Sequence, residues 1–192
     1  MPKDENTDMQ TASAATSMLG PSGDYEQVFR KYHSLIVGTA YRVTGSSDDA
    51  EDVLQTVFMR LLRRWQEIDL SSNPGAYLRR AAVNASLDLL RARTRAAAVP
   101  LDDSPFDLEE TSEASPEQHR LDAEMNRRLR QAIATLSDKS ARVFTLRYLE
   151  EVDNKEIARM LEMSQTAVAV MLHRGRHKIR QQLGEFLGGM ES

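Results

Sequence analysis

Apolar residues recur at the three- and four-residue spacing of an amphipathic helix in several stretches separated by polar breaks. The first stretch begins at Asp24 and ends before Gly45, which commonly follows the last helical turn because glycine tolerates positive φ. Its apolar face consists of Val28, Phe29, Tyr32, Leu35, Ile36, Ala40 and Val43. The pattern predicts one packed amphipathic helix.

A second helix is predicted to begin at Ser46 or Ser47. Its buried stripe consists of Val53, Leu54, Val57, Phe58, Leu61, Leu62 and Trp65. Acidic residues in the first turn and arginines in the last match the helix dipole at both ends. Asp48, Asp52 and Gln55 share one outward strip, which is either an ordinary solvated surface or a docking strip for a basic helical partner.

A third helix is predicted where Asn73 supplies a cap and Pro74 the first helical position. Its polar side is basic and carries one amide: Arg79, Arg80, Asn84, Arg91, Arg93 and Arg95. Asparagine can bond a base edge, arginines can follow the phosphate backbone, and Tyr77 can stack on an unpaired base. This side therefore either binds nucleic acid or is solubilising surface.

Four more helical patterns follow. Two are predicted from Pro116 and from Ser137, with these apolar positions: Leu121, Met125, Leu129, Ile133, Leu136, Val143, Phe144, Leu146, Tyr148 and Leu149. The other two lie between Asn154 and Arg180, on either side of a short break, with small Ala158 where they would press together. The C-terminal part is thus a four-helix module whose last pair is either a helix-turn-helix or a plain helical hairpin.

The last helix pair has the features of a DNA-binding motif. Asp153 and Ser164 can cap its two helices, and the second helix ends in a basic run suited to phosphate oxygens. We therefore expect that helix to lie in a DNA major groove. Glu162 occupies the turn position that usually holds glycine with positive φ, a geometry that would cost this residue about 1 kcal/mol.

The net charge of −4 conceals an asymmetry along the chain. Residues 25–95 hold eleven basic against eight acidic residues, and residues 118–192 hold thirteen against ten. Residues 96–117 hold seven acidic residues and no Lys or Arg, and three prolines interrupt any helix there. Two basic blocks are thus joined by an acidic linker. Residues 1–23 have little to bury and are expected to be a disordered tail.

Composition excludes several classes of protein. The chain has no cysteine, which rules out disulfides and thiolate metal sites and fits a reducing compartment. No apolar run approaches the ~20 residues that a membrane helix needs, so we expect a cytoplasmic protein without membrane insertion. An enzyme has little support: His173 and His177 lack a third metal ligand, and neighbouring arginines would repel a cation. No cofactor is expected.

Two blocks of the chain, in this order and at this distance, resemble the extracytoplasmic-function (group IV) sigma factors of the sigma-70 family, which are bacterial transcription initiation factors. The family's polymerase-binding helix is similar to DDAEDVLQTVFMRLLRRW, and its minus-10 helix to PGAYLRRAAVNASLDLLRARTR. Its minus-35 domain is similar to LSDKSARVFTLRYLEEVDNKEIARMLEMSQTAVAVMLHRGRHKIRQQL.

The resemblance implies an all-α protein of two small helical domains joined by a flexible acidic linker. After the disordered tail, sigma domain 2 would span 24–95, the linker 96–115, and sigma domain 4, with its helix-turn-helix, 116–187. Such a protein binds core RNA polymerase through the clamp helices and the flap, directs it to minus-10 and minus-35 elements, and helps to melt promoter DNA. Members are commonly held inactive by an anti-sigma factor, so such a partner is expected.

The resemblance also implies roles for individual residues. Polymerase contacts are implied for Asp48, Asp52 and Gln55. Contacts to minus-10 DNA are implied for Tyr77, Arg80, Asn84, Arg91, Arg93 and Arg95, with a flipped base held beside the loop from Glu67 to Pro74. Contacts to minus-35 DNA are implied for Gln165, Thr166, Ala169, Val170, His173, Arg174, Arg176 and Lys178.

The recognition helix departs from the family pattern, because Ala169, Val170 and Met171 stand where members commonly carry Lys, Ser and Arg. Minus-35 recognition would then depend on few hydrogen bonds, on thymine methyl contacts and on DNA shape. Alternatively, this apolar patch binds protein.

An alternative for the whole chain is an ordinary helix-turn-helix regulator that binds DNA as a dimer and does not act through core polymerase. Such a regulator would not require the arginine-rich helix that carries Asn84, and that helix is the feature that separates the two hypotheses.

Overall fold

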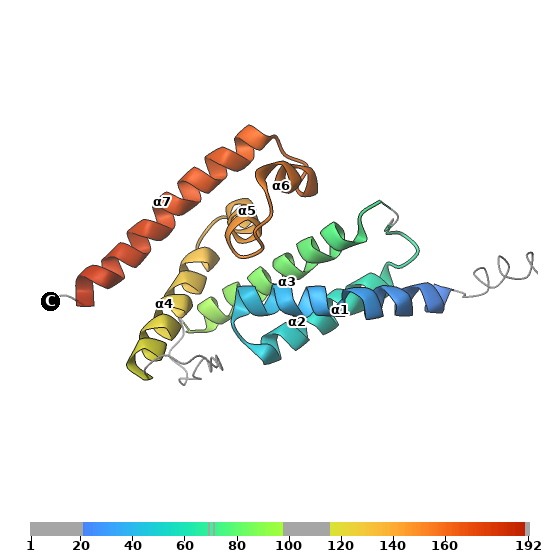
Figure 1. Ribbon diagram of the computed structural model, residues 1–192, viewed down its shortest axis with the longest axis horizontal. Coiled ribbons are helices and arrows are strands. Elements are labelled where there is room, and N and C mark those ends of the chain that lie inside the picture. The colour runs from blue at the N-terminus through green and yellow to red at the C-terminus, as the bar shows by residue number, and fades with distance from the viewer. Residues whose placement is uncertain (1–20, 69, 71, 98–115, 191–192) are drawn as a thin grey trace, which may run out of the picture.

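The computed structural model describes residues 21–68, 70, 72–97 and 116–190, and within them all regular structure is α-helical. The helices are α1 (Pro21–Thr44), α2 (Ser47–Arg63), α3 (Pro74–Ala97), α4 (Pro116–Ala134), α5 (Asp138–Tyr148), α6 (Asn154–Met160) and α7 (Gln165–Met190), as Figure 1 shows. The predicted all-α fold is confirmed. The predicted tail and acidic linker fall largely on residues 1–20 and 98–115, outside the described part, and α1 begins at Pro21, earlier than predicted.

Helices α1, α2 and α3 pack side by side into an N-terminal domain. Tyr25 closes one end of this domain: its hydroxyl donates to the main-chain oxygen of Phe58 at 3.0 Å, and its ring meets Trp65 edge-on with centroids 5.3 Å apart. Burial of aromatic and aliphatic surface is the main stabilising contribution in a domain of this size. The buried core consists of Ile36, Ala40, Val53, Val57, Phe58, Leu61, Leu78 and Ala82.

The helix caps expected from the sequence are present. In each case a side-chain oxygen accepts a hydrogen bond from the main-chain N–H three residues later, at 2.7 to 3.3 Å. Gly45 ends α1 with a φ of 74°, as expected of a glycine at this position. The capping residues are Ser46, Asn73, Asp153 and Ser164.

Four residues at predicted apolar positions are instead exposed. Leu62, Leu121, Tyr148 and Phe29 keep 52%, 46%, 42% and 39% of their surface accessible. Leu62 lies next to buried Leu61 at the edge of the predicted apolar stripe. Helix α2 packs mainly against α1 and α3, and neither helix covers that edge, so Leu62 faces solvent. Phe29 and Tyr148 each have one covered side, because Phe29 stacks on His33 and Tyr148 packs on the ring of Phe144.

Helices α4 to α7 form a C-terminal domain. Helices α5 and α7 approach closely where Gly175 faces Phe144, since a Cβ at Gly175 would lie 3.4 Å from the ring, at van der Waals contact distance. A side chain longer than that of alanine would therefore have to displace the Phe144 ring or α7. The buried core of this domain consists of Ile133, Leu136, Ala141, Phe144, Leu146, Ile157, Val168, Leu172 and Ile179.

The two domains also pack on each other. Val43 of α1 and Val83, Leu87 and Leu90 of α3 are at most 3% exposed and belong to the same apolar cluster as the C-terminal core. Helix α3 contacts α4, α5 and α6 and thus lies between α1 and the C-terminal domain (Figure 1). We call this packing the closed arrangement. The hydrophobic pattern of the sequence does not predict it, because an amphipathic face does not identify its partner.

Candidate nucleic-acid interface

Helices α6 and α7 form the predicted helix-turn-helix. Buried Ile157 and Ala158 of α6 share one apolar cluster with Val168 and Leu172 of α7. Glu162, in the turn, has a φ of 54°, so the turn keeps the left-handed geometry although its residue is not glycine. That conformation costs a residue with a Cβ about 1 kcal/mol.

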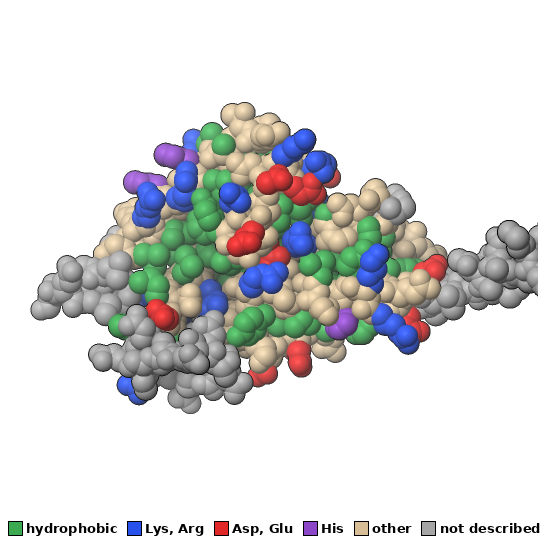
Figure 2. Space-filling view, in the orientation of Figure 1, with side chains coloured by type: hydrophobic (Ala, Val, Ile, Leu, Met, Phe, Trp, Pro, Cys, Tyr) green, Lys and Arg blue, Asp and Glu red, His purple; other side chains and the backbone are tan. Residues whose placement is uncertain are grey.

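Helix α7 exposes every residue predicted to contact minus-35 DNA: Gln165, Thr166, Ala169, Val170, His173, Arg174, Arg176 and Lys178. Figure 2 shows the Lys, Arg and His side chains gathered at the upper left, over α7. Lys178 also donates from its Nζ to the main-chain oxygen of Thr135 at 2.7 Å, which ties α7 to the end of α4. The predicted residues are therefore together on one helix, with a polar start and a basic second half.

The apolar residues in the middle of α7 divide between two environments. Val170 is 43% exposed and Ala169 is exposed, whereas Met171 is half-buried against the C-terminal core. Of the three unusual residues, only Ala169 and Val170 therefore belong to the outward surface.

The predicted minus-10 residues lie on α3, but the closed arrangement engages several of them. The Nη1 of Arg80 donates to the main-chain oxygen of Met160 at 2.7 Å, and its guanidinium lies 5.9 Å from the ring centre of half-buried Tyr77. Arg91 is paired with Asp138, Nη1 to Oδ1, at 3.0 Å. The side of α3 that was expected to face DNA thus faces the C-terminal domain.

Asn84 lies on the same side of α3. Its Oδ1 is buried and has no hydrogen-bond partner in the described structure. An amide oxygen buried in this way costs roughly 1–3 kcal/mol. The closed arrangement is therefore imperfectly satisfied at the residue that was expected to bond a base.

Arg93 and Arg95 differ in their surroundings. Arg93 donates to the Oδ1 of Asp49, whose side chain is only 1% exposed, so Arg93 compensates a buried carboxylate. Burial raises the pKa of Asp49, and the positive charge of Arg93 opposes that shift. Arg95, by contrast, is exposed at the end of the helix.

The predicted polymerase-binding strip is exposed along α2. Asp48, Asp52 and Gln55 all face solvent, and the same helical strip continues with Met59 and Leu62, which are also exposed. These two apolar members were not expected on the strip, because the periodicity predicted Leu62 to be buried and gave Met59 no role. An acidic and apolar strip of this kind fits a partner helix that offers both basic and apolar side chains.

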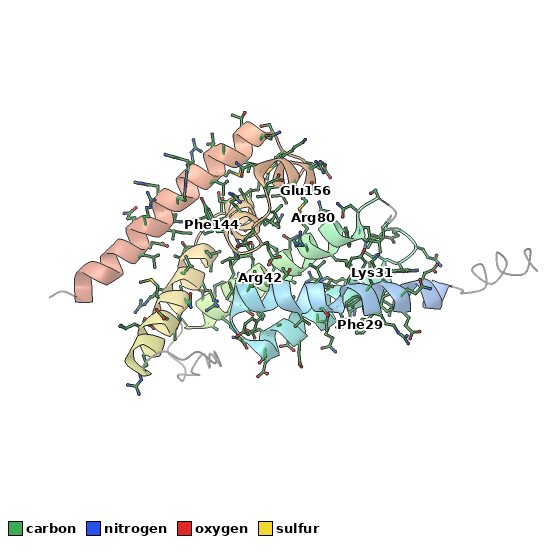
Figure 3. The ribbon with its side chains drawn as sticks, viewed as in Figure 1. Phe29, Lys31, Arg42, Arg80, Phe144 and Glu156 are labelled. Carbon is green, nitrogen blue, oxygen red and sulfur yellow. The ribbon has the colours of Figure 1, made fainter. Side chains whose placement is uncertain are left out.

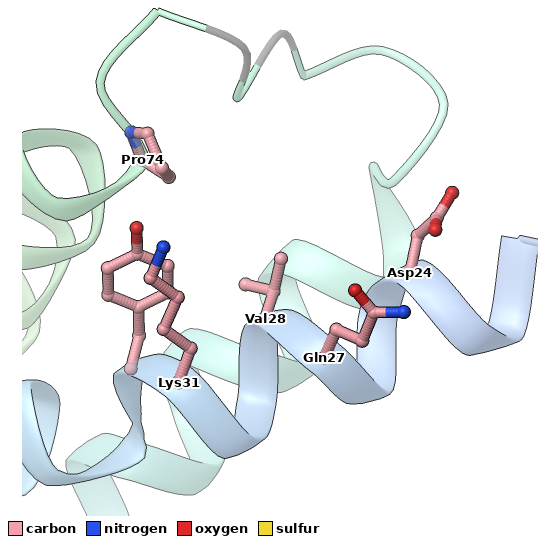
Figure 4. A pocket seen from close by; sticks show the side chains of 6 residues that line it. Asp24, Gln27, Val28, Lys31 and Pro74 are labelled. Atoms are coloured by element: carbon pink, nitrogen blue, oxygen red, sulfur yellow. The ribbon is translucent and has the colours of Figure 1, made fainter. Parts of the chain in front are cut away.

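A shallow hollow lies at the N-terminal end of α3 (Figure 4). Lys31 and Tyr32 of α1 face Pro74 across it, and the Lys31 Nζ lies 5.3 Å from the Tyr32 ring centre. The remaining lining comes from Asp24, Gln27 and Val28. The hollow adjoins the loop that was expected to hold a flipped base, of which residues 69 and 71 lie outside the described structure.

A cluster of charged residues between the domains was not expected from the sequence. Glu150, just after α5, has a side chain that is 1% exposed and accepts hydrogen bonds from Thr39 and Arg42 of α1. Arg79 of α3 lies 3.3 Å from the same carboxylate. These residues are more than 70 positions from Glu150 in the chain, so no local sequence signal could have joined them.

Two properties of the described residues bear on other functions. No described helix has the length and apolar character needed to cross a membrane. In the same part of the chain, no group of three or more His, Cys, Asp or Glu side chains has an arrangement that could hold a metal ion. His173 and His177 are both exposed on α7.

Comparisons with known proteins agree with this geometry. The N-terminal helices match the sigma-70 region 2 family over residues 28–96, and the C-terminal helices match the sigma-70 region 4 family over residues 126–179. The chain is 30% identical over 165 residues to the RNA polymerase sigma-E factor of Streptomyces coelicolor, covering 86% of this chain and 89% of that protein. It is 28% identical over 186 residues to the ECF RNA polymerase sigma factor SigE of Mycolicibacterium smegmatis, covering 94% and 71%.

The fold is also found among solved structures. It is similar to the sigma factor RpoE from Bartonella quintana, solved in complex with the anti-sigma factor NepR, with a TM-score of 0.53 and 16% identity over 84% of this chain and 97% of that chain. The region 2 match decides against an ordinary helix-turn-helix regulator, since such a protein has no need of a polymerase-binding domain. The chain belongs to the extracytoplasmic-function group of the sigma-70 family and is a non-enzymatic initiation factor that directs RNA polymerase to promoters.

Proposed function

We propose that α7 recognises the minus-35 element, and the observation that carries this assignment is the exposure of its polar and basic residues beyond a helix-turn-helix turn. Base edges are contacted by Gln165, Thr166, Ala169, Val170 and His173, and phosphates by Arg174, Arg176 and Lys178. Val170 offers an apolar contact to a thymine methyl group in place of a hydrogen bond. Recognition therefore depends on few base-specific hydrogen bonds and on DNA shape.

Helix α3 is assigned to the minus-10 element. Tyr77, Arg80 and Asn84 hold a flipped base together with the loop before Pro74, and Arg91, Arg93 and Arg95 hold backbone phosphates. The chemistry of the side chains supports this assignment, because an amide can pair with a base edge and an aromatic ring can stack on an unpaired base. The assignment requires the closed arrangement to open, since Arg80 and Arg91 are bonded to the C-terminal domain in it.

The strip on α2 is assigned to core RNA polymerase. Asp48, Asp52 and Gln55 supply its polar contacts, and we extend the strip to Met59 and Leu62 because both are exposed on the same side of the helix. In a docking surface of this kind, the apolar residues supply contact area that is buried on binding, and the acidic residues fix the orientation of the partner.

An anti-sigma factor is proposed as a further partner. Support comes from RpoE of Bartonella quintana, which is similar in fold and was solved with such a factor. We place the protein in the cytoplasm, where RNA polymerase acts. The proposed functional domains span 24–95 and 116–187, with residues 96–115 as the linker between them.

Run-off transcription tests the residue assignments. Core RNA polymerase would be combined with wild type, Asn84→Ala or Arg174→Ala on a pool of promoter fragments. Arg120→Ala, at an exposed position of α4, is the control. We expect discrete start sites for wild type, their loss with Asn84→Ala, and a uniform reduction with Arg174→Ala. Full transcription by Asn84→Ala would refute the assignment of α3 to the minus-10 element.

A further inference from the structure

Two hydrogen-bonding side chains and a neighbouring guanidinium surround the Glu150 carboxylate and together make a binding site for an oxyanion. Thr39 donates from Oγ1 to the Glu150 Oε2 at 2.8 Å, and Arg42 donates from Nε and Nη2 to the two carboxylate oxygens at 2.8 and 3.0 Å. The Nε of Arg79 lies 3.3 Å from Oε2 and forms an ion pair with it, but makes no hydrogen bond in the described structure. We call Thr39, Arg42 and Arg79 the anion cradle.

The anion cradle belongs wholly to the N-terminal domain, whereas its occupant belongs to the C-terminal domain. Thr39 and Arg42 lie one turn apart on α1, and Arg79 lies on α3. A bidentate guanidinium, a hydroxyl and a second guanidinium suit a phosphate group as well as a carboxylate. When the domains separate, the cradle keeps two positive charges and loses the carboxylate that is bonded to them, so it becomes a site for another oxyanion.

The anion cradle adjoins the side of α3 that is proposed to bind DNA. Arg79 directly precedes Arg80, and Figure 3 shows Arg42 and Arg80 on the parts of α1 and α3 that face the C-terminal domain. In the same closed arrangement Arg80 is bonded to Met160 and Arg91 is paired with Asp138, both in the C-terminal domain. The closed arrangement and DNA therefore compete for the same surface.

We propose that Thr39, Arg42 and Arg79 bind a backbone phosphate of promoter DNA, and that Glu150 occupies this site as an internal substitute for the phosphate while the domains are closed. The proposal deepens the assignment of α3 to the minus-10 element and rests on it for the position of the DNA. By linkage, DNA that fills the cradle must favour separation of the domains by the same factor as separation favours DNA binding.

The test uses the full chain, which has no native cysteine and so accepts two site-specific dyes at Glu51→Cys and Gln181→Cys, both exposed. Domain separation is measured by energy transfer, and affinity is measured against a mixed-sequence DNA duplex with a single-stranded overhang, over a range of salt concentrations. We expect Glu150→Gln to separate the domains and to raise DNA affinity about 5- to 150-fold, the usual range of such coupling. Asp122→Asn removes an exposed charge from α4 and is expected to change neither.

A second substitution distinguishes phosphate binding from simple opening. Adding Arg79→Gln to Glu150→Gln should lower DNA affinity again and reduce the slope of log affinity against log salt by about one phosphate contact. If affinity and slope stay unchanged, the cradle does not hold DNA and the proposal is wrong. It is also wrong if Glu150→Gln leaves the domains closed, or if inorganic phosphate alone opens the wild type as well as DNA does.

Two further measurements keep these outcomes separate from other failures. If Glu150→Gln does not fold, Thr39→Val removes one donor with little change of shape and should open the domains to a smaller extent, and no opening would overturn the proposal. The assignment of α3 is tested independently by the transcription of Asn84→Ala. Suppose that Asn84→Ala transcribes normally while Arg79→Gln lowers DNA affinity and the salt slope as expected. The proposed pocket for the flipped base would then be refuted, and phosphate binding by the anion cradle would stand.

Discussion

Arg80 on α3 donates from Nη1 to the main-chain oxygen of Met160, 2.7 Å away, although the two residues are 80 positions apart in the sequence. Met160 is the last residue of α6, so this hydrogen bond joins the proposed minus-10 helix to the helix-turn-helix. While Nη1 donates to this carbonyl, the guanidinium is held against α6 and part of its donor capacity is not available to DNA. Domain closure and promoter opening therefore make opposite demands on one side chain.

Replacing Arg80 by Gln should affect both states. The variant loses a charge-assisted hydrogen bond between the domains, so we expect greater domain separation in the free chain. It also loses a proposed contact to the flipped base, so we expect slower promoter melting with core polymerase, measured by permanganate reactivity of unpaired thymines. Arg95→Gln, on an exposed arginine, is the control and should leave domain separation unchanged. Unchanged melting by Arg80→Gln would contradict its proposed role.

Glu162→Gly should stabilise the C-terminal domain. Glu162 has a φ of 54°, a conformation that glycine adopts without the steric cost of a Cβ, so the gain should be about 1 kcal/mol in the free energy of unfolding. Urea denaturation followed by circular dichroism measures it. Glu162→Ala keeps the Cβ and is the matched control, for which no comparable gain is expected. Equal stability of the Gly and Ala variants would show that the turn is not strained.

Asp49→Asn should change how stability depends on pH. Burial raises the pKa of Asp49 in the folded protein, so the folded state binds this proton more tightly than the unfolded state does. The contribution of Asp49 to wild-type stability is therefore fully present below the unfolded pKa of about 3.9 and falls as pH rises through the folded pKa. Asn cannot ionise, so the variant should gain stability relative to wild type across that window.

Urea denaturation of both proteins from pH 3 to pH 7 measures this difference. Glu51→Gln removes an exposed charge from the same helix and controls for the change in net charge. If the stability of Asp49→Asn relative to wild type instead rises as the pH falls, the pKa of Asp49 is lowered by folding. The Arg93 contact then outweighs the cost of burial.

The local structure of this chain follows closely from its sequence, because helix periodicity and caps depend on neighbouring residues. Asn73, Asp153 and Ser164 cap as expected, and Gly45 adopts the expected positive φ. The exposure of Leu62 shows the limit of periodicity: an apolar residue at the edge of a stripe is buried only if a neighbouring helix covers it.

The contacts between the domains are of another kind. Glu150 contacts Thr39 and Arg42, which lie more than 100 positions away in the chain. No local sequence pattern distinguishes Glu150 from its exposed neighbour Glu151. The candidate DNA side chains on α7 could be predicted because they share one helix. Those on α3 could be named as well. Their contacts with the C-terminal domain could not be predicted, because those contacts depend on which amphipathic surfaces pack together.

Base reading and phosphate binding on α7 should separate experimentally. Gln165 lies at the start of the helix, where its amide can bond a base edge, whereas Arg174 lies in the basic second half. Gln165→Ala should cost about 1–3 kcal/mol at one base pair and relax preference there, with little change in salt dependence. Arg174→Ala should weaken binding to all sequences alike and lower the salt slope by about one contact. Holoenzyme binding to a library of minus-35 sequences at two salt concentrations distinguishes these outcomes. A change of sequence preference in Arg174→Ala, or a change of salt slope alone in Gln165→Ala, would mean that α7 lies in the groove with a different face toward the bases.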